Sequence, residues 1–293
     1  MLPFYVKIRN MTKLQKYLFL IIAVLTAVMI TICASLYHAI HTEPNEIAIN
    51  YQMIHDKKIP ADMYDVSIAY FTDLEYGTYQ DAKRTDALFK KLNDLHPDIL
   101  IFGGDLFEAE YEPSEEEKNQ MIDRLASIDA PLGKFAVLGE QDLTSEERLA
   151  LVSDVYGRSQ IELIDNSNRF VANMSKSGIK LIGLRPEVNY DTALAGVDNS
   201  TYNLLISHYA DPLCSDVLKN AHVSYALAGN AHGTQIMYPV LGGYKEYEGN
   251  TKLNRDKTQN LPFKYLISRG TGCIHVNARL NATPEIVYII FTR

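Results

Sequence analysis

Acidic, amide and imidazole side chains that suit metal binding recur at five points of this sequence, each just after an apolar run. The run at 99–102 leads through two glycines to Asp105, and Glu108 follows. The other four points carry Asp73 with Glu75, Glu140 with Asp142, His208, and Asn230 with His232. Such groups bind Mg, Mn, Fe or Zn, and two of these ions about 3.5–4 Å apart are typical of phosphoester hydrolysis.

Each of these residues also has an ordinary structural explanation when it is taken alone. Asp105 and Glu108 match an Asp-x-x-Glu capping box, which would begin a helix rather than bind a ligand. Acidic pairs are common on solvated surfaces, and a single His after a strand is more often structural than a ligand. The metal hypothesis depends on all five points together, because the carboxyl ends of parallel strands meet at one edge of a sheet.

Short apolar runs and amphipathic segments predict the elements that would position these residues. Uninterrupted apolar runs are typical of strands buried on both faces of a sheet, and they occur at 66–71, 99–102, 134–138, 202–207 and 224–228. Helices are predicted over 81–95, 114–128 and 144–156. A hairpin at 170–184, a long polar loop at 242–261 and a last strand at 285–291 follow. This alternation predicts an α/β fold, a layered sandwich of mixed sheets flanked by helices.

The order of the motifs resembles that of the calcineurin-like metallophosphoesterases, in particular a bacterial membrane-anchored branch. The matching motifs are Asp73-x-x, Gly104-Asp105-x-x-Glu108, Gly139-x-x-Asp142, Ser207-His208 and Gly229-x-x-His232-Gly233, with support from 268–272 and 279–281. The resemblance covers residues 45–293 and implies a four-layer sandwich. It also implies two divalent metal ions, one bound by Asp73, Glu75, Asp105 and His232, and the other by Asp105, Glu140, His208 and Asn230.

Three of the motifs depart from the family pattern at residues that matter for chemistry. Glu75 and Asn230 each replace a His, Glu140 replaces an Asn, and Gln141 replaces a catalytic His that the following residue, here Asp142, would orient. The altered ligands can still bind an ion, but the site becomes richer in oxygen, which favours Mn or Mg over Fe or Zn. Glutamine can hydrogen-bond a phosphate oxygen but cannot protonate a leaving group, a step worth about 10²–10⁴-fold.

The resemblance and the departures from it leave two functions open. The first is a metal-dependent phosphoesterase that hydrolyses a phosphoester or pyrophosphate bond by attack of a metal-bound hydroxide, with weakened or retuned activity. Its substrate would be a phosphorylated small molecule or a lipid head group. The second is a catalytically inactive relative that binds a phosphate-bearing ligand or a protein partner.

The first 40 residues differ from the rest of the chain in charge and hydropathy. From Tyr17 to Leu36 the sequence is mostly apolar and uncharged, which is the length that crosses a bilayer as a helix. All the bases of this region precede the run, so the positive-inside rule predicts a cytoplasmic N-terminus. A cleaved signal peptide is the competing interpretation, but its apolar core would be shorter. We predict a basic cytoplasmic tail over 1–16, a single-pass signal anchor in the cell membrane over 17–40, and an extracytoplasmic phosphoesterase domain over 41–293.

Charge and cysteine content exclude some other classes of protein. The chain of 293 residues has a net charge of −8, although its first 40 residues hold four bases and no acid. The acidic residues 41–293 are a poor partner for nucleic acid, because binding to phosphates depends on Lys and Arg. Three cysteines allow at most one disulfide, between Cys214 and Cys273 if Cys33 is in the membrane, and no cysteine-type zinc site.

Overall fold

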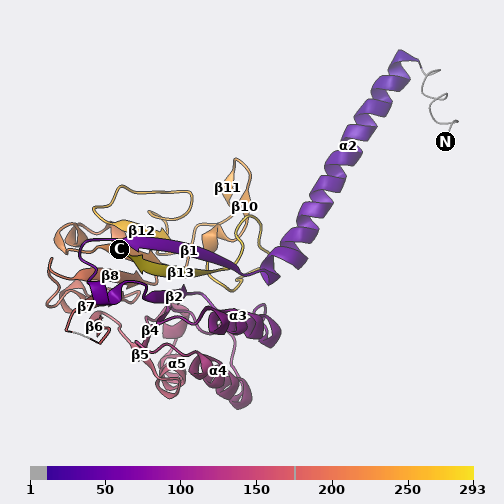
Figure 1. Cartoon of the computed structure of the whole chain (residues 1–293). Coiled ribbons are helices and arrows are strands. Elements are labelled where there is room, and N and C mark those ends of the chain that lie inside the picture. Colours follow the sequence, from indigo (N-terminus) through magenta and orange to yellow (C-terminus); the bar gives the residue numbers. More distant parts are fainter. Residues whose placement is uncertain (1–11, 175) are drawn as a thin grey trace.

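The computed structural model describes residues 12–174 and 176–293 (Figure 1). Helix α2, Lys13–Tyr37, begins with a capping box between Thr12 and Gln15 and projects from the body of the molecule. Among the described residues, one helical stretch, Lys13–Asn45, is long and apolar enough to cross a membrane. Its most apolar window has a mean hydropathy of 2.7 and no buried residue. The predicted basic tail lies mostly outside the described residues.

The helical path continues past α2 into contact with the body. A π-helical turn, His38–Thr42, and a 3-10 turn, Glu43–Asn45, follow directly. Glu43 is buried, and its carboxylate accepts hydrogen bonds from the backbone of Asn281 at 2.9 Å and of Ala282 at 2.7 Å. The backbone N–H of Arg279 donates to the Ala39 carbonyl at 2.8 Å. The segment that follows α2 is therefore docked on the domain.

The first sheet holds three of the site-bearing strand ends. Within the described residues its strand order is β1-β13-β2-β3-β4-β5. The last four strands are parallel, whereas β13 runs antiparallel to β2 and parallel to the edge strand β1. Their bounds are Ala48–His55 (β1), Ser67–Phe71 (β2), Ile99–Phe102 (β3), Lys134–Ala136 (β4), Ile161–Leu163 (β5) and Glu285–Thr292 (β13).

The second sheet has the order β12-β9-β8-β7-β6 among the described residues. Strands β7, β8, β9 and β12 are parallel, and β6 pairs with β7 as the predicted hairpin. The bounds are Ser167–Ala172 (β6), Gly178–Leu184 (β7), Tyr202–Ser207 (β8), Tyr225–Ala228 (β9) and Lys264–Ile267 (β12). A small separate hairpin joins β10, Met237–Tyr238, to β11, Gly242–Gly243.

The two sheets pack face to face, and helices cover the outer face of each. In β2, Ile68 and Tyr70 face the apolar core between the sheets, whereas Ala69 and Phe71 face the helices. This double burial explains the uninterrupted apolar runs. The helices on the first sheet are α3, Ala82–Leu95, α4, Glu115–Ser127, and α5, Glu146–Arg158. Helix α6, Tyr190–Ala193, and short 3-10 turns pack on the second. The predicted layered α/β sandwich is confirmed.

Candidate metal centre

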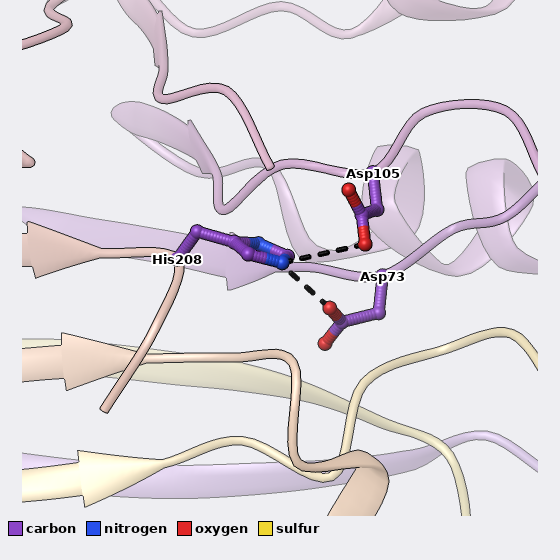
Figure 2. A group of neighbouring side chains, drawn as sticks. All are labelled: Asp73, Asp105 and His208. Carbon is purple, nitrogen blue, oxygen red and sulfur yellow. Dashed lines mark ion pairs between the residues drawn. The ribbon is translucent and has the colours of Figure 1, made fainter. Parts of the chain in front are cut away.

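Loops after strands of both sheets bring the predicted metal-binding residues together. Asp73 follows β2, Asp105 follows β3 and His208 follows β8. Figure 2 shows the three side chains pointing toward one another from different segments, and one ligand atom of each lies within 4.8 Å of the others. All three side chains are fully buried. The predicted convergence of these loops therefore holds, even though Asp73 and His208 are far apart in the sequence.

His208 lies at the centre of the first group of candidate ligands. Its Nε2 is 2.7 Å from Glu140 Oε2 and 3.3 Å from Asp105 Oδ2. Its Nδ1 is 2.7 Å from the carbonyl oxygen of Gly103, which fixes the ring and leaves Nε2 to face the carboxylates. Glu140 is the most solvent-accessible member of the group, with 37% of its side chain exposed. Two of the four ligands predicted for the second ion, Asp105 and Glu140, thus surround a third, His208.

His232 and Glu75 form a second group. His232 Nε2 lies 3.1 Å from Glu75 Oε1, and both side chains are buried. Arg279 approaches the other ring nitrogen, with its Nη2 3.3 Å from His232 Nδ1. The guanidinium of Arg279 is itself fully buried, and it donates to main-chain carbonyls of Arg269, Gly272, His232 and Ala282. Arg279 therefore positions His232 and also braces the loops around it.

Asn230 is held in one orientation by the polar loop that follows it. Its side-chain amide donates to the Glu248 carbonyl at 2.5 Å and to Asn250 Oδ1 at 2.8 Å. Both amide hydrogens are therefore used, and the side-chain oxygen is the atom left for a ligand. The backbone N–H of Asn230 donates to the Asp73 carboxylate at 2.9 Å. This contact links the ligand loops of the two sheets.

Left-handed backbone conformations are concentrated among the candidate ligands. Five of the seven have left-handed φ angles, namely Asp73 at 55°, Glu75 at 50°, Asp105 at 60°, Asn230 at 59° and His232 at 46°. Such conformations cost free energy in non-glycine residues and gather at functional sites. Gly139 permits the close approach of the loops, because a Cβ atom there would lie 2.1 Å from Asp105 Oδ1. The local strain supports a functional role for these loops.

Asp105 and Asp142 have different structural roles from those that simple motifs suggest. Among the described residues no helix begins at Asp105, so the capping-box explanation is wrong. Instead, Asp105 Oδ1 accepts a hydrogen bond from the Gln141 backbone N–H at 2.9 Å. Asp142 is fully buried and accepts backbone hydrogen bonds from Asp105, Leu106 and Gly139 at 2.9–3.0 Å. Gln141 accepts from the Ala109 N–H at 2.7 Å through its side-chain oxygen. A side-chain hydrogen bond from Gln141 to Glu75 acts to lower the pKa of that carboxyl, so the amide nitrogen of Gln141 faces the metal centre.

Electrostatics show how crowded the carboxylates are. Burial raises the pKa of Asp73 and Asp105 and raises the pKa of Glu75 to about 8. Burial alone would lower the pKa of His208, but Asp105 and Glu140 raise it well above the usual histidine value. Burial also lowers the pKa of His232 to about 4, so this ring is neutral at physiological pH, as metal ligation requires.

Buried atoms without hydrogen-bond partners indicate what the centre is built to hold. Glu75 Oε2, Asp105 Oδ2, Glu140 Oε2 and His208 Nε2 are all buried and lack a hydrogen bond of acceptable geometry. Buried polar atoms are normally satisfied, and unpaired buried charges are costly. Oxygen and imidazole atoms that converge without partners fit a divalent cation, because the cation would satisfy them all and offset the carboxylate charge. The residues present therefore fit the metal that the motifs predict.

A pocket of about 540 Å³ lies over the centre and contains residues that the sequence reasoning missed. Glu140, Gln141 and Asn230 contribute to its lining, and the additional residues include Tyr79, Tyr209, Lys245, Tyr247 and His275. Lys245 Nζ is 2.6 Å from His275 Nε2, and the ring of Tyr247 stacks on that of His275. Tyr247 belongs to the polar loop predicted at 242–261, and Arg255 of the same loop donates to the Asn281 carbonyl. No spacing signal marks the lysine or the histidine, since both lie in irregular segments.

Comparison with known proteins shows which proteins the chain is similar to. No family model matches the chain. The uncharacterized metallophosphoesterase YkuE of Bacillus subtilis (strain 168) is 23% identical over 265 residues, which cover 87% of this chain and 88% of YkuE. Other relatives described as metallophosphoesterases match comparable stretches. The chain is similar to metallophosphoesterases over most of its length.

The chain also matches part of a protein with a named activity. The UDP-2,3-diacylglucosamine pyrophosphatase LpxG of Chlamydia muridarum is 31% identical over 119 residues, which cover 40% of this chain but 35% of LpxG. Among solved structures, the calcineurin-like phosphoesterase YfkN of Bacillus subtilis is similar, with a TM-score of 0.41 and 14% identity over 71% of this chain and 82% of YfkN.

Proposed function

We propose that this protein is a membrane-anchored, metal-dependent phosphoesterase that hydrolyses a phosphoester or pyrophosphate bond outside the cytoplasm. One observation carries the proposal, the buried carboxylate and imidazole atoms that converge without hydrogen-bond partners. Similarity to metallophosphoesterases over most of the chain supports it, as does the apolar helix before the domain. The partial match to LpxG, named as a pyrophosphatase of a diacylated sugar nucleotide, supports phosphate-bearing substrates.

The candidate ligands divide into two sets around the centre. Asp105, Glu140, His208 and Asn230 would hold one ion, while Asp73, Glu75 and His232, with Asp105 between the sets, would hold the other. When bound, divalent ions supply Lewis acidity and lower the pKa of the water that attacks phosphorus. The high share of oxygen atoms favours Mn or Mg.

The remaining residues of the site bind and orient the substrate. Gln141 lines the pocket, and its amide nitrogen, which faces Glu75, would donate its second hydrogen to a phosphate oxygen. Lys245, a cation in a lining otherwise rich in carboxylates, would attract the substrate phosphate. Because Gln141 cannot donate a proton to the leaving group, we expect the enzyme to prefer leaving groups that depart as anions, such as nitrophenolate or a phosphate.

The full-length protein in detergent micelles allows a direct test. With Mn added, we expect hydrolysis of bis-p-nitrophenyl phosphate, and we expect the Asp105→Ala variant to fall to the uncatalysed rate. Asp94→Ala is the matched control, because Asp94 is an exposed carboxylate paired with Lys90 on helix α3. Equal rates for the Asp105→Ala and unaltered proteins would overturn the proposal.

A second candidate function is a relative without turnover that binds a phosphate-bearing ligand or a protein. The glutamine at position 141 favours it, since this residue is where the family carries its proton donor. Elemental analysis and thermal melting separate the two functions. A protein that binds Mn, melts at a higher temperature with Mn, yet hydrolyses no phosphoester would be the inactive relative.

A further inference from the structure

An apolar groove separates the end of helix α2 from the β10–β11 hairpin. Its volume is about 1140 Å³, and helix residues from Ile30 to Ile40 form one wall. Tyr238 and Pro239 of the hairpin, with Val276 and Leu280, contribute to the other. None of the described residues that line it is Asp, Glu, Lys or Arg. A groove of this size and composition is unusual on a surface that meets water.

The tip of the hairpin is apolar and unusually exposed. Val240 is 104% exposed and Leu241 is 84% exposed, and Tyr238 beside them is 46% exposed. Val276, on the neighbouring segment, is also exposed. Figure 1 shows the hairpin and α2 projecting from the same side of the domain. The exposed apolar side chains therefore extend the apolar surface of the helix.

Hydrogen bonds fix the hairpin relative to the helix. The Met237 N–H donates to the Leu280 carbonyl at 2.8 Å, and Asn281 Nδ2 donates to the Met237 carbonyl at 2.9 Å. The same segment is bonded to the end of the helical path through Ala39 and Glu43. The hairpin and the helix thus share one support, so the depth of one in a membrane sets the depth of the other.

The length of the anchor places the groove within the bilayer. The run from Tyr17 to Leu36 rises about 30 Å as a helix, which matches the hydrocarbon thickness. Ile30 lies about 9 Å inside the end of this run, yet it lines the groove together with Tyr238 and Pro239. We propose that the hairpin tip, Tyr238 to Leu241, inserts into the leaflet on the domain side and that acyl chains of membrane lipid fill the groove.

This arrangement also bears on the substrate, a consequence that depends on the proposed function. One short segment separates the groove from the pocket over the metal centre, since Ile274 and His275 line the pocket and Val276 lines the groove. A lipid with its chains in the groove would carry its head group to the pocket side of this segment. The substrate class is then a phosphorylated membrane lipid rather than a free metabolite.

The absence of tryptophan from the sequence makes insertion measurable without background. Leu241→Trp would be placed in the full-length protein, in vesicles of phosphatidylcholine and phosphatidylglycerol that contain brominated phosphatidylcholine. Leu25→Trp in α2 serves as the lipid-exposed reference. Phe170→Trp is the matched control, because Phe170 is an apolar residue, 46% exposed, on β6 away from α2.

We expect blue-shifted emission and strong bromine quenching for Leu241→Trp and Leu25→Trp, and neither for Phe170→Trp. Emission of Leu241→Trp that matches Phe170→Trp would overturn the proposal, and so would a blue shift without quenching, which indicates a protein partner or a second copy. A second arm compares Leu241→Asp with Val217→Asp, another exposed apolar position. Leu241→Asp should lower hydrolysis of diacylglycerol pyrophosphate in vesicles, whose leaving group is a phosphate, but not of soluble bis-p-nitrophenyl phosphate. Quenching without any hydrolysis would reject the proposed function and retain the insertion.

Discussion

Asp142 gives the sharpest test of how the metal centre is held together. Its carboxylate accepts three backbone hydrogen bonds, two through Oδ2 from Asp105 and Gly139 and one through Oδ1 from Leu106. It therefore clamps the loops after β3 and β4, which carry two candidate ligands. The change Asp142→Asn keeps the shape of the side chain and replaces one acceptor oxygen with a donor.

The magnitude follows from these three contacts. One backbone N–H is left facing an amide donor, and an orphaned buried donor costs about 1–3 kcal/mol. The two retained bonds become neutral, and each loses about 1 kcal/mol relative to a bond with a charged acceptor. Burial raises the pKa of Asp142, so removal of the charge recovers part of this loss. We expect the free energy of unfolding to fall by about 2–4 kcal/mol.

Urea unfolding of the full-length protein in detergent, followed by circular dichroism, measures this change, and Mn titration measures the metal centre. The matched control is Asp98→Asn, because Asp98 Oδ2 accepts from Ser67 N and Oγ at the start of β2 and β3, the opposite end of the sheet from the metal centre. The control should lose less stability and bind Mn normally, whereas Asp142→Asn should bind Mn more weakly. Unchanged stability and Mn affinity in Asp142→Asn would refute the clamp.

Two further predictions concern groups outside the centre. Glu43→Gln should lower the free energy of unfolding by about 1–3 kcal/mol, because one of the backbone donors of Asn281 and Ala282 loses its acceptor. An unchanged melting temperature, with no gain in protease cleavage near residue 43, would contradict the docking of this helical segment on the domain. Burial raises the pKa of Asp165 to about 6, so its folded form holds a proton more firmly than the unfolded chain and stability falls as the pH rises from about 4 through 6. The side-chain oxygen of Asp165→Asn can still accept from Leu138 N, so this variant should be more stable than the unaltered protein at pH 7.5 by at most about 3 kcal/mol. Measured from pH 4 to 8, the difference in the free energy of unfolding should shrink toward the acid end. A difference independent of pH would argue against the raised pKa.

The sequence was sufficient to predict the strands and the convergence of their ends. Runs such as 99–102 are apolar throughout because both faces of the strand are buried, and this pattern can be recognised from the sequence alone. The positions of Asp73, Asp105 and His208 just after such strands then predict a shared site from topology alone. The membrane branch, the anchor orientation and the individual ligand roles stay predictions.

Other features depend on contacts between distant segments and could not be predicted. The Glu43 carboxylate binds backbone N–H groups near residue 282, and no sequence pattern around Glu43 predicts this long-range contact. Lys245 and His275 meet over the pocket because two irregular loops cross, which hydropathy does not encode. The left-handed φ angles of the candidate ligands could not be predicted either, since only a few per cent of non-glycine residues adopt them and no local pattern shows which residues do.

The place of β13 has a consequence for how the chain is made. This strand, encoded near residue 290, lies between β1 and β2, which are encoded more than 200 residues earlier. Both neighbouring strands, β1 and β2, are therefore synthesised long before β13, and the first sheet of the nascent domain stays incomplete until β13 has been made. If α2 enters the membrane early in synthesis, assembly of that sheet ends beside the bilayer, on a chain that is already tethered.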